Sequence, residues 1–140
     1  MAAIELLQDD PDGFLLIIEG ARIDMASHNN DLERTITETI AFDEAIAAVN
    51  TWADQRDGAT VLVTADHECG GLVPVGEAVK GELPEVEWRW GQHTNARVDI
   101  FGRGPGSEVF DGEVRTPLGV WPVQLDGSYE ATCWYGVPCP

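Results

Sequence analysis

Carboxylates and imidazoles gather in three short segments of this sequence. Asp24 and His28 lie four residues apart, Asp66 and His67 are adjacent, and His93 comes further along the chain. If the first segment forms a helix, Asp24 and His28 share one face and can reach the same ion. A carboxylate together with neutral imidazoles suits Zn²⁺. All 3 histidines of the chain belong to these segments, so the pattern indicates a metal site.

The elements that must position these residues alternate as in an α/β protein. The apolar run from Phe14 to Ile18 predicts a buried strand. Apolar residues at three- and four-residue steps predict an amphipathic helix from Asp31 to Asp54. Thr60 to Thr64 predicts the next strand, which places Asp66 and His67 just past its end. Strand, helix and strand at this spacing predict a parallel crossover, with ligands gathered at the carboxyl ends of the strands.

Two later segments are less regular. Residues 71–92 contain several glycines and prolines without clean periodicity and predict an insertion, in which Trp88 and Trp90 pack or form a wall over the site. Residues 97–101 predict a further strand, with residues 102–106 as its turn.

Composition bounds the class of protein. With 140 residues the chain has material for one core and little room for two domains. Its formal net charge is -17, from 25 acidic and 8 basic side chains, which makes nucleic acid and anionic membranes poor partners. No stretch approaches the roughly 20 apolar residues of a membrane span. A phosphate ester is also an anion, so bound metal ions would have to reverse the local potential.

The cysteines and one acid near the candidate ligands leave alternatives open. Cys133 and Cys139 can close a small loop in an oxidising compartment, which leaves Cys69 unpaired. Cys69 follows His67 by two residues, and we favour a packing role for it over a thiolate ligand. Glu68 either supports the site from behind the ligands or is a solvated acid, and we favour the solvated acid.

Simpler roles also compete for the other candidate ligands. A helix N-cap can use Asp24 or Asp31 without any metal. Glu19 can form an ion pair with Arg22 or Arg34. These roles explain single residues, but they do not explain why the carboxylates and histidines occur together.

Four motifs resemble the alkaline phosphatase family in order and spacing. Any one of them is weak, because Thr-Ala-Asp-His alone recurs in related phosphomutases and sulfatases, but four in order are specific. The motifs are residues 14–24 with His28, residues 39–45, residues 63–71, and His93-Thr94 before residues 101–106.

The resemblance implies hydrolysis of phosphate monoesters at a site with two zinc ions and one magnesium ion. By the resemblance, Glu19 holds the magnesium, whose preference for oxygen ligands agrees with a carboxylate. The zinc ligands that it implies are Asp24, His28 and His93 for the zinc that activates water, and Asp66 and His67 for the zinc that faces the nucleophile.

The sequence departs from the family pattern on its N-terminal side. Members attack phosphate with a serine in an Asp-Ser pair and bind it with an arginine, yet no Asp-Ser dipeptide occurs here and residues 1–13 supply neither group. We therefore assign no catalytic residue and expect this chain alone to be inactive or nearly so. The fold class is expected to be α/β, part of a mainly parallel alkaline-phosphatase-like sheet with flanking helices, incomplete at its N-terminal side.

Three parts are expected along the chain: a lead-in at residues 1–13, a partial alkaline-phosphatase-like domain at residues 14–110, and a divergent tail at residues 111–140. Prolines in the tail oppose a helix and favour a hairpin about Asp126-Gly127. We expect a homo-oligomer or association with an N-terminal half, and the resemblance implies a periplasmic or extracellular location. The alternatives are a non-catalytic metal-binding fragment that needs an N-terminal partner, and a related metal-dependent phosphomutase.

Overall fold

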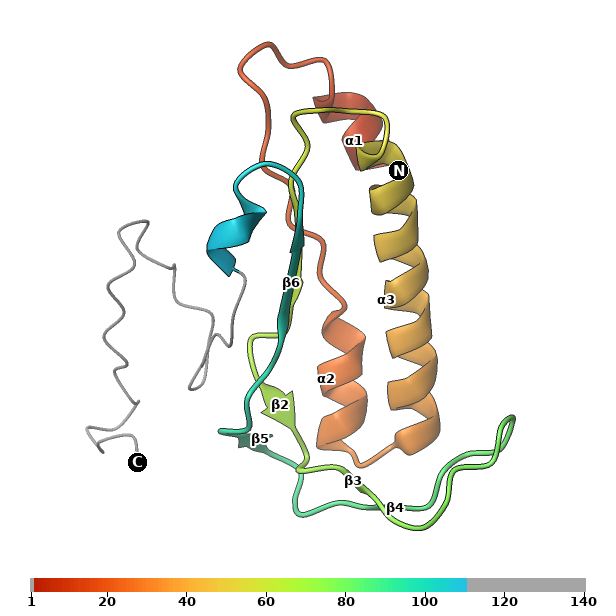
Figure 1. Cartoon of the computed structure of the whole chain (residues 1–140). Helices are drawn as coiled ribbons and strands as arrows, with labels where there is room; N and C mark the ends of the chain where they lie inside the picture. Colours follow the sequence, from red (N-terminus) through yellow and green to blue (C-terminus); the bar gives the residue numbers. More distant parts are fainter. Residues whose placement is uncertain (1, 111–140) are drawn as a thin grey trace, which may run out of the picture.

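Three α-helices come first in the described part of the chain, and six short strands and a 3₁₀-helix follow them (Figure 1). The computed structural model describes residues 2–110. Its elements, in order, are α1 (Ala2–Leu7), α2 (Ala21–His28), α3 (Leu32–Ala53), β1 (Val61–Thr64), β2 (Glu68–Cys69), β3 (Val73–Pro74), β4 (Val86–Glu87), β5 (His93–Thr94), β6 (Ile100–Arg103) and the 3₁₀-helix η1 (Ser107–Phe110).

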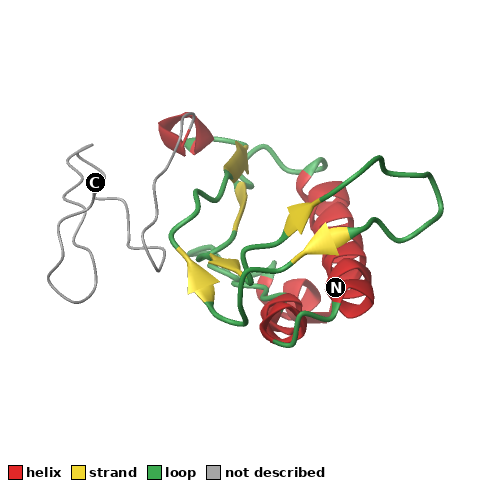
Figure 2. Ribbon diagram, turned by 90° about the horizontal axis from the view of Figure 1, so that it is seen from below, coloured by secondary structure: helices red, strands yellow, loops and turns green. Residues whose placement is uncertain are grey.

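The helix predicted for residues 31–54 is confirmed as α3. Asp31 is its N-cap, because its carboxylate accepts a hydrogen bond from the backbone N–H of Arg34 at 3.1 Å. The helix packs along α2, and the two lie side by side in both ribbon views (Figures 1 and 2). This packing fixes the orientation of the helix that carries Asp24 and His28.

All strand pairs among residues 2–110 are antiparallel. β1, predicted as residues 60–64, pairs with β6, β2 pairs with β5, and β3 pairs with β4. The presence of both helices and strands agrees with the predicted α/β class. The predicted parallel crossover, however, is not formed within the described residues. The reason lies at residues 14–18, which were predicted as a strand but have no strand assignment, because no described segment pairs with their backbone.

Two further expectations need correction. Residues 71–92 include an antiparallel ladder, with Val73 opposite Glu87, rather than only an irregular insertion. The last strand begins at Ile100 and includes Gly102, which was predicted to be in a turn. Gly102 lies opposite Leu62, and a Cβ there would lie 3.1 Å from the Leu62 side chain, so glycine permits the close approach of β1 and β6.

The core of the described chain is small. The buried apolar residues are Ile4, Ala26 and Ala53, and no large side chain is fully buried within residues 2–110. Leu15 is 86% exposed and Ile17 is 83% exposed. These apolar side chains belong to the unpaired segment, so one surface is left uncovered by the described residues.

The N-terminal helix nevertheless docks onto the end of α3. The Gln8 side-chain carbonyl accepts hydrogen bonds from Trp52 Nε1 at 3.2 Å and from the Arg56 guanidinium at 3.0 Å. Among residues 2–110, none of the helices combines the length and the apolar composition that spanning a membrane requires. The predicted hairpin about Asp126-Gly127 and the Cys133–Cys139 pairing lie outside the described residues.

Candidate metal centre

Helix α2 supplies two of the candidate ligands, Asp24 from its first turn and His28 from its last. Asp24 and His28 lie one helical turn apart, and Asp24 Oδ2 is 3.4 Å from His28 Nε2. The prediction that the two side chains share one helical face is confirmed.

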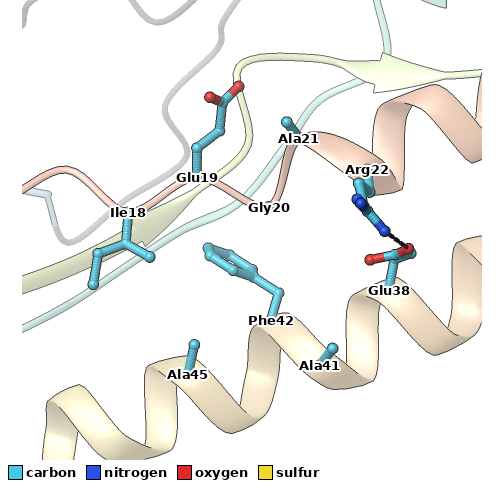
Figure 3. Close-up of a pocket in the computed structure, with 9 residues that line it drawn as sticks. All are labelled: Ile18, Glu19, Gly20, Ala21, Arg22, Glu38, Ala41, Phe42 and Ala45. Atoms are coloured by element: carbon cyan, nitrogen blue, oxygen red, sulfur yellow. Dashed lines mark ion pairs between the residues drawn. The ribbon is translucent and has the colours of Figure 1, made fainter. Parts of the chain in front are cut away.

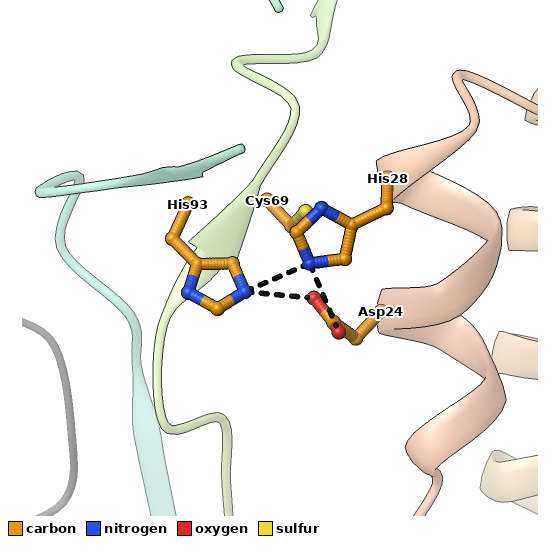
Figure 4. Close-up of side chains that lie close together, drawn as sticks. All are labelled: Asp24, His28, Cys69 and His93. Atoms are coloured by element: carbon orange, nitrogen blue, oxygen red, sulfur yellow. Dashed lines mark hydrogen bonds and ion pairs between the residues drawn. The ribbon is translucent and has the colours of Figure 1, made fainter. Parts of the chain in front are cut away.

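Two short strands bring further ligand groups to this face of α2. Cys69 in β2 lies directly opposite His93 in β5, and side chains opposite each other in a ladder project to the same side of the sheet. His93 Nε2 lies 3.0 Å from His28 Nε2 and 3.3 Å from Asp24 Oδ1 (Figure 4). One ligand-type atom from each of these four residues lies within 4.8 Å of the other three.

A backbone carbonyl sets the tautomer of His28. Its Nδ1 lies 2.7 Å from the carbonyl oxygen of Gly91, and because a carbonyl can only accept, Nδ1 carries the hydrogen and donates it. In the neutral imidazole, Nε2 then keeps its lone pair and points at the cluster. The contact depends on glycine, since a Cβ on residue 91 would lie 2.6 Å from the carbonyl oxygen of His28.

One buried hydrogen-bond acceptor in the cluster has no donor. Asp24 Oδ1 is buried and receives no hydrogen bond within the described chain, although it lies 3.3 Å from His93 Nε2. Ligands about 2.05 Å from a tetrahedral zinc ion are separated by about 3.4 Å from one another. The distances of 3.0 to 3.4 Å among Asp24, His28 and His93 resemble such an edge, so these residues fit a zinc ion.

Cys69 is the member of the cluster that the sequence did not assign to it. Burial, followed by the hydrogen bond and negative charge of Asp24 and the charge of Glu68, raises the pKa of the Cys69 thiol to about 12 in the metal-free chain. We had favoured a packing role for Cys69. The signal for its place in the cluster is its register opposite His93, which residue spacing alone does not reveal.

Glu68 is not the solvated acid that we had favoured. Its half-buried carboxylate accepts hydrogen bonds from the backbone N–H groups of Gly71 at 3.0 Å and Leu72 at 3.4 Å, and from the Thr94 hydroxyl. Thr94 lies opposite Glu68 in the ladder, next to the Cys69–His93 pair. Glu68 thus ties the turn after β2 to β5 and holds the two strands that carry Cys69 and His93.

The predicted second pair of zinc ligands lies beside this cluster. The His67 ring stacks on the His93 ring, with centroids 3.5 Å apart, and His67 Nε2 lies 3.2 Å from Asp66 Oδ2. Buried His67 Nδ1 has no hydrogen-bond partner in the described chain, whereas the Asp66 side chain is 68% exposed. The structure therefore brings His67 against the first group and leaves Asp66 at the surface.

Glu19 is not among the residues that the structure gathers. It lies in the segment before α2, at a pocket floored by Phe42 of α3, and its carboxylate points away from that ring (Figure 3). The alternative ion pairs are not formed either, because Arg22 and Arg34 both lie near Glu38, at 3.6 and 3.7 Å. The magnesium role of Glu19 stays a prediction.

The family model described as "Alkaline phosphatase" matches residues 1–87. The chain is 37% identical over 118 residues to the tissue-nonspecific alkaline phosphatase of Rattus norvegicus, which covers 79% of this chain and 21% of that protein. It is 46% identical over 80 residues to the repressible alkaline phosphatase of Saccharomyces cerevisiae, covering 56% of this chain and 14% of that protein. The chain thus spans about a fifth or less of these curated relatives.

Solved structures agree. The alkaline phosphatase of the Antarctic bacterium TAB5 superposes with a TM-score of 0.70 at 33% identity, covering 77% of this chain and 33% of that one. A cold-active alkaline phosphatase from Shewanella sp. shares the fold with a TM-score of 0.73 at 22% identity, covering 81% of this chain and 45% of that one. These likenesses confirm that the α/β fold is part of an alkaline phosphatase fold. The chain belongs to the alkaline phosphatase family.

Proposed function

We propose that this chain supplies metal ligands to an alkaline phosphatase that hydrolyses phosphate monoesters at a site with two zinc ions and one magnesium ion. The observation that carries the proposal is the convergence of Asp24, His28 and His93, whose ligand atoms approach one another to 3.0 to 3.4 Å. Two half-buried imidazoles facing a carboxylate oxygen without a hydrogen-bond donor form an arrangement that a cation would stabilise.

The proposed site has three further ligands, which lie outside the Asp24, His28 and His93 group. Asp66 and His67 are proposed for the second zinc, supported by the stacking of His67 on His93 at 3.5 Å, which brings the two groups of ligands together. Glu19 is proposed for magnesium, and a TAB5 alkaline phosphatase mutant that superposes on this chain has Mg bound in its M3 site.

The metal ions would supply charge stabilisation for the transferred phosphoryl group and lower the pKa of bound water. The residues of this chain hold and orient them. The Gly91 carbonyl keeps the proton of His28 on Nδ1, and the Glu68–Thr94 contact holds the strand that carries His93. With a net charge of -17, the chain repels a phosphate ester until such ions are bound.

The nucleophile is proposed to come from outside this sequence. No Asp-Ser dipeptide occurs in it, and the hydroxyls nearest in sequence to the ligands are already engaged. Ser27 is buried and donates to the Ile23 carbonyl at 3.0 Å, while Thr64 donates to the carbonyls of Ala65 and Asp99. We propose that an N-terminal half of an alkaline phosphatase supplies the serine and the phosphate-binding arginine.

That half, or another copy of the chain, would cover the exposed apolar residues Leu15 and Ile17. A periplasmic or extracellular location is part of the same proposal. The second candidate function is metal binding without catalysis by this chain alone. It is favoured by the same cluster and by the missing Asp-Ser pair.

A phosphatase assay tests the proposal. The chain is incubated with an aryl phosphate, zinc and magnesium, alone and with the N-terminal half of a related alkaline phosphatase. We expect only a trace above background from the chain alone, because losing a nucleophile removes several orders of magnitude of rate. Activity should appear in the mixture and disappear with His93→Ala. Failure of the mixture to depend on His93 would contradict the assignment, and robust turnover by the lone chain would show that it carries its own nucleophile.

A further inference from the structure

Cys69 lies beside the three ligands proposed for the first zinc ion, and the proposed phosphatase site gives it no role. Its sulfur and one ligand atom each of Asp24, His28 and His93 all lie within 4.8 Å of one another, and all four residues are half-buried. Figure 4 shows the sulfur behind the His28 ring. The thiol is therefore close enough to act on the ligands without being one of them.

The contact that the thiol makes is with one of these ligands. The Cys69 side chain forms a hydrogen bond with the Asp24 carboxylate. The thiol is the donor, because an ionised carboxylate can only accept. A sulfur that gives its hydrogen to Asp24 contacts a ligand instead of the ion. The zinc then keeps three protein ligands and one open position, the arrangement of a catalytic zinc that binds water.

The position of the sulfur is fixed by the fold. Cys69 pairs with His93 across the ladder, and the next residue, Gly70, donates its N–H to the Gln92 carbonyl at 2.9 Å. Gly70 is buried with a φ of +92°, and the Trp88 ring occupies the place where its Cβ would lie, 2.5 Å away. The backbone beside Cys69 is thereby held from both sides, so the thiol keeps its direction toward α2.

Two of the proposed ligands have a hydrogen-bond partner that can orient them. His28 donates from Nδ1 to the Gly91 carbonyl at 2.7 Å, and Asp24 accepts from the Cys69 thiol. Asp24 Oδ1, which is 3.3 Å from His93 Nε2, is buried and receives no hydrogen bond from any described residue, so this oxygen remains for an ion. Outer partners of this kind orient ligating imidazoles and carboxylates and strengthen metal binding. The thiol contact on Asp24 is the counterpart of the Gly91 contact on His28.

We infer that Cys69 is a positioning residue, whose Sγ–H group holds the Asp24 carboxylate in the orientation that binds the zinc ion. The inference rests on the proposed zinc site and deepens it. It requires that residue 69 contributes a hydrogen-bond donor, and that neither sulfur as such nor side-chain size is what matters. A hydroxyl at this position should therefore replace the thiol, whereas an apolar side chain of the same shape should not.

Zinc affinity in matched pairs of variants tests the inference. The parent is the full chain carrying Cys133→Ser and Cys139→Ser, so that Cys69 is its single thiol. Threonine and valine have the same branched shape, but only threonine has a donor. In competition with a chelating indicator, Cys69→Thr should bind zinc nearly as well as the parent, and Cys69→Val about 10- to 100-fold more weakly. Cys69→Ser and Cys69→Ala should repeat this difference with smaller side chains.

Cobalt absorption spectroscopy adds a signature that distinguishes a donor from a ligand. Co²⁺ is added to the parent and to Cys69→Thr under reducing conditions. We expect the visible bands of bound cobalt in both proteins and no thiolate-to-cobalt charge-transfer band in the parent, because the sulfur stays protonated on Asp24.

The outcomes separate this inference from the function on which it rests. Equal zinc affinity in Cys69→Thr and Cys69→Val, or a charge-transfer band in the parent, would overturn the positioning role. If His28→Ala still abolishes metal binding in that case, the zinc site stands. A parent that binds neither zinc nor cobalt would overturn both. Far-ultraviolet circular dichroism of each metal-free variant checks its fold, and the serine and alanine pair decides if the valine variant fails to fold.

Discussion

Replacing Gly91 by alanine should weaken zinc binding without touching a ligand. The new Cβ would lie 2.6 Å from the His28 carbonyl oxygen, whereas ordinary contacts begin at 3.4 Å, so the two backbones must separate. A movement of about 0.8 Å stretches the 2.7 Å bond from His28 Nδ1 to the Gly91 carbonyl to about 3.5 Å, beyond hydrogen-bond length. His28 then loses the contact that orients its ring and selects its tautomer.

Loss of such a partner typically costs about 10- to 100-fold in metal affinity, or about 1.4 to 2.7 kcal/mol. The assay is competition for zinc with a chelating indicator at fixed pH, with thermal unfolding of the metal-free protein recorded alongside. Gly58→Ala is the matched control, because a Cβ on Gly58 meets nothing within 4 Å. Unchanged zinc affinity in Gly91→Ala, or an equal loss in Gly58→Ala, would refute the role assigned to the Gly91 carbonyl.

Two further predictions concern the support of the site and its uncovered surface. Glu68→Ala leaves three donors without their acceptor and should lower the free energy of unfolding by about 1 to 3 kcal/mol, measured by urea denaturation, whereas exposed Glu77→Ala should change it little. A loss of unfolding free energy no larger than that of the control would contradict the role of Glu68 in holding β2 to β5. Burial of Leu15 or Ile17 would each contribute about 1.5 to 3 kcal/mol, so the chain should self-associate, as measured by sedimentation velocity. The double variant Leu15→Gln, Ile17→Gln should reduce this self-association. A monomeric parent chain with a cooperative thermal transition would show that this surface is already covered.

Local patterns predicted the helical part of the site well. The three- and four-residue periodicity and the Asp31 cap located α3 to within a residue at each end. The four-residue spacing of Asp24 and His28 was sufficient to place them on one face of α2. Both features depend on backbone geometry within a few residues, which the sequence specifies directly.

Long-range pairing explains what the sequence did not predict. The apolar run from Phe14 to Ile18 has strand composition, but a ladder needs a neighbour, and none is present among residues 2–110. The place of Cys69 in the cluster follows from its register opposite His93, 24 positions later in the numbering. From the sequence Glu68 resembles a surface acid. The groups that donate hydrogen bonds to its carboxylate, including the Thr94 hydroxyl, come from a turn and from a strand distant in the sequence.

The central claim is that Asp24, His28 and His93 hold a zinc ion, and metal analysis after dialysis tests it most directly. The zinc content per chain is measured by elemental analysis for the parent chain, for His28→Ala and for the surface control Glu77→Ala. We predict about one tightly held zinc per chain in the parent and the control, with further zinc and magnesium bound weakly, because this ion has more protein ligands than the others. His28→Ala should lose the tight zinc. No retained zinc in the parent chain, or equal retention in His28→Ala, would contradict the account.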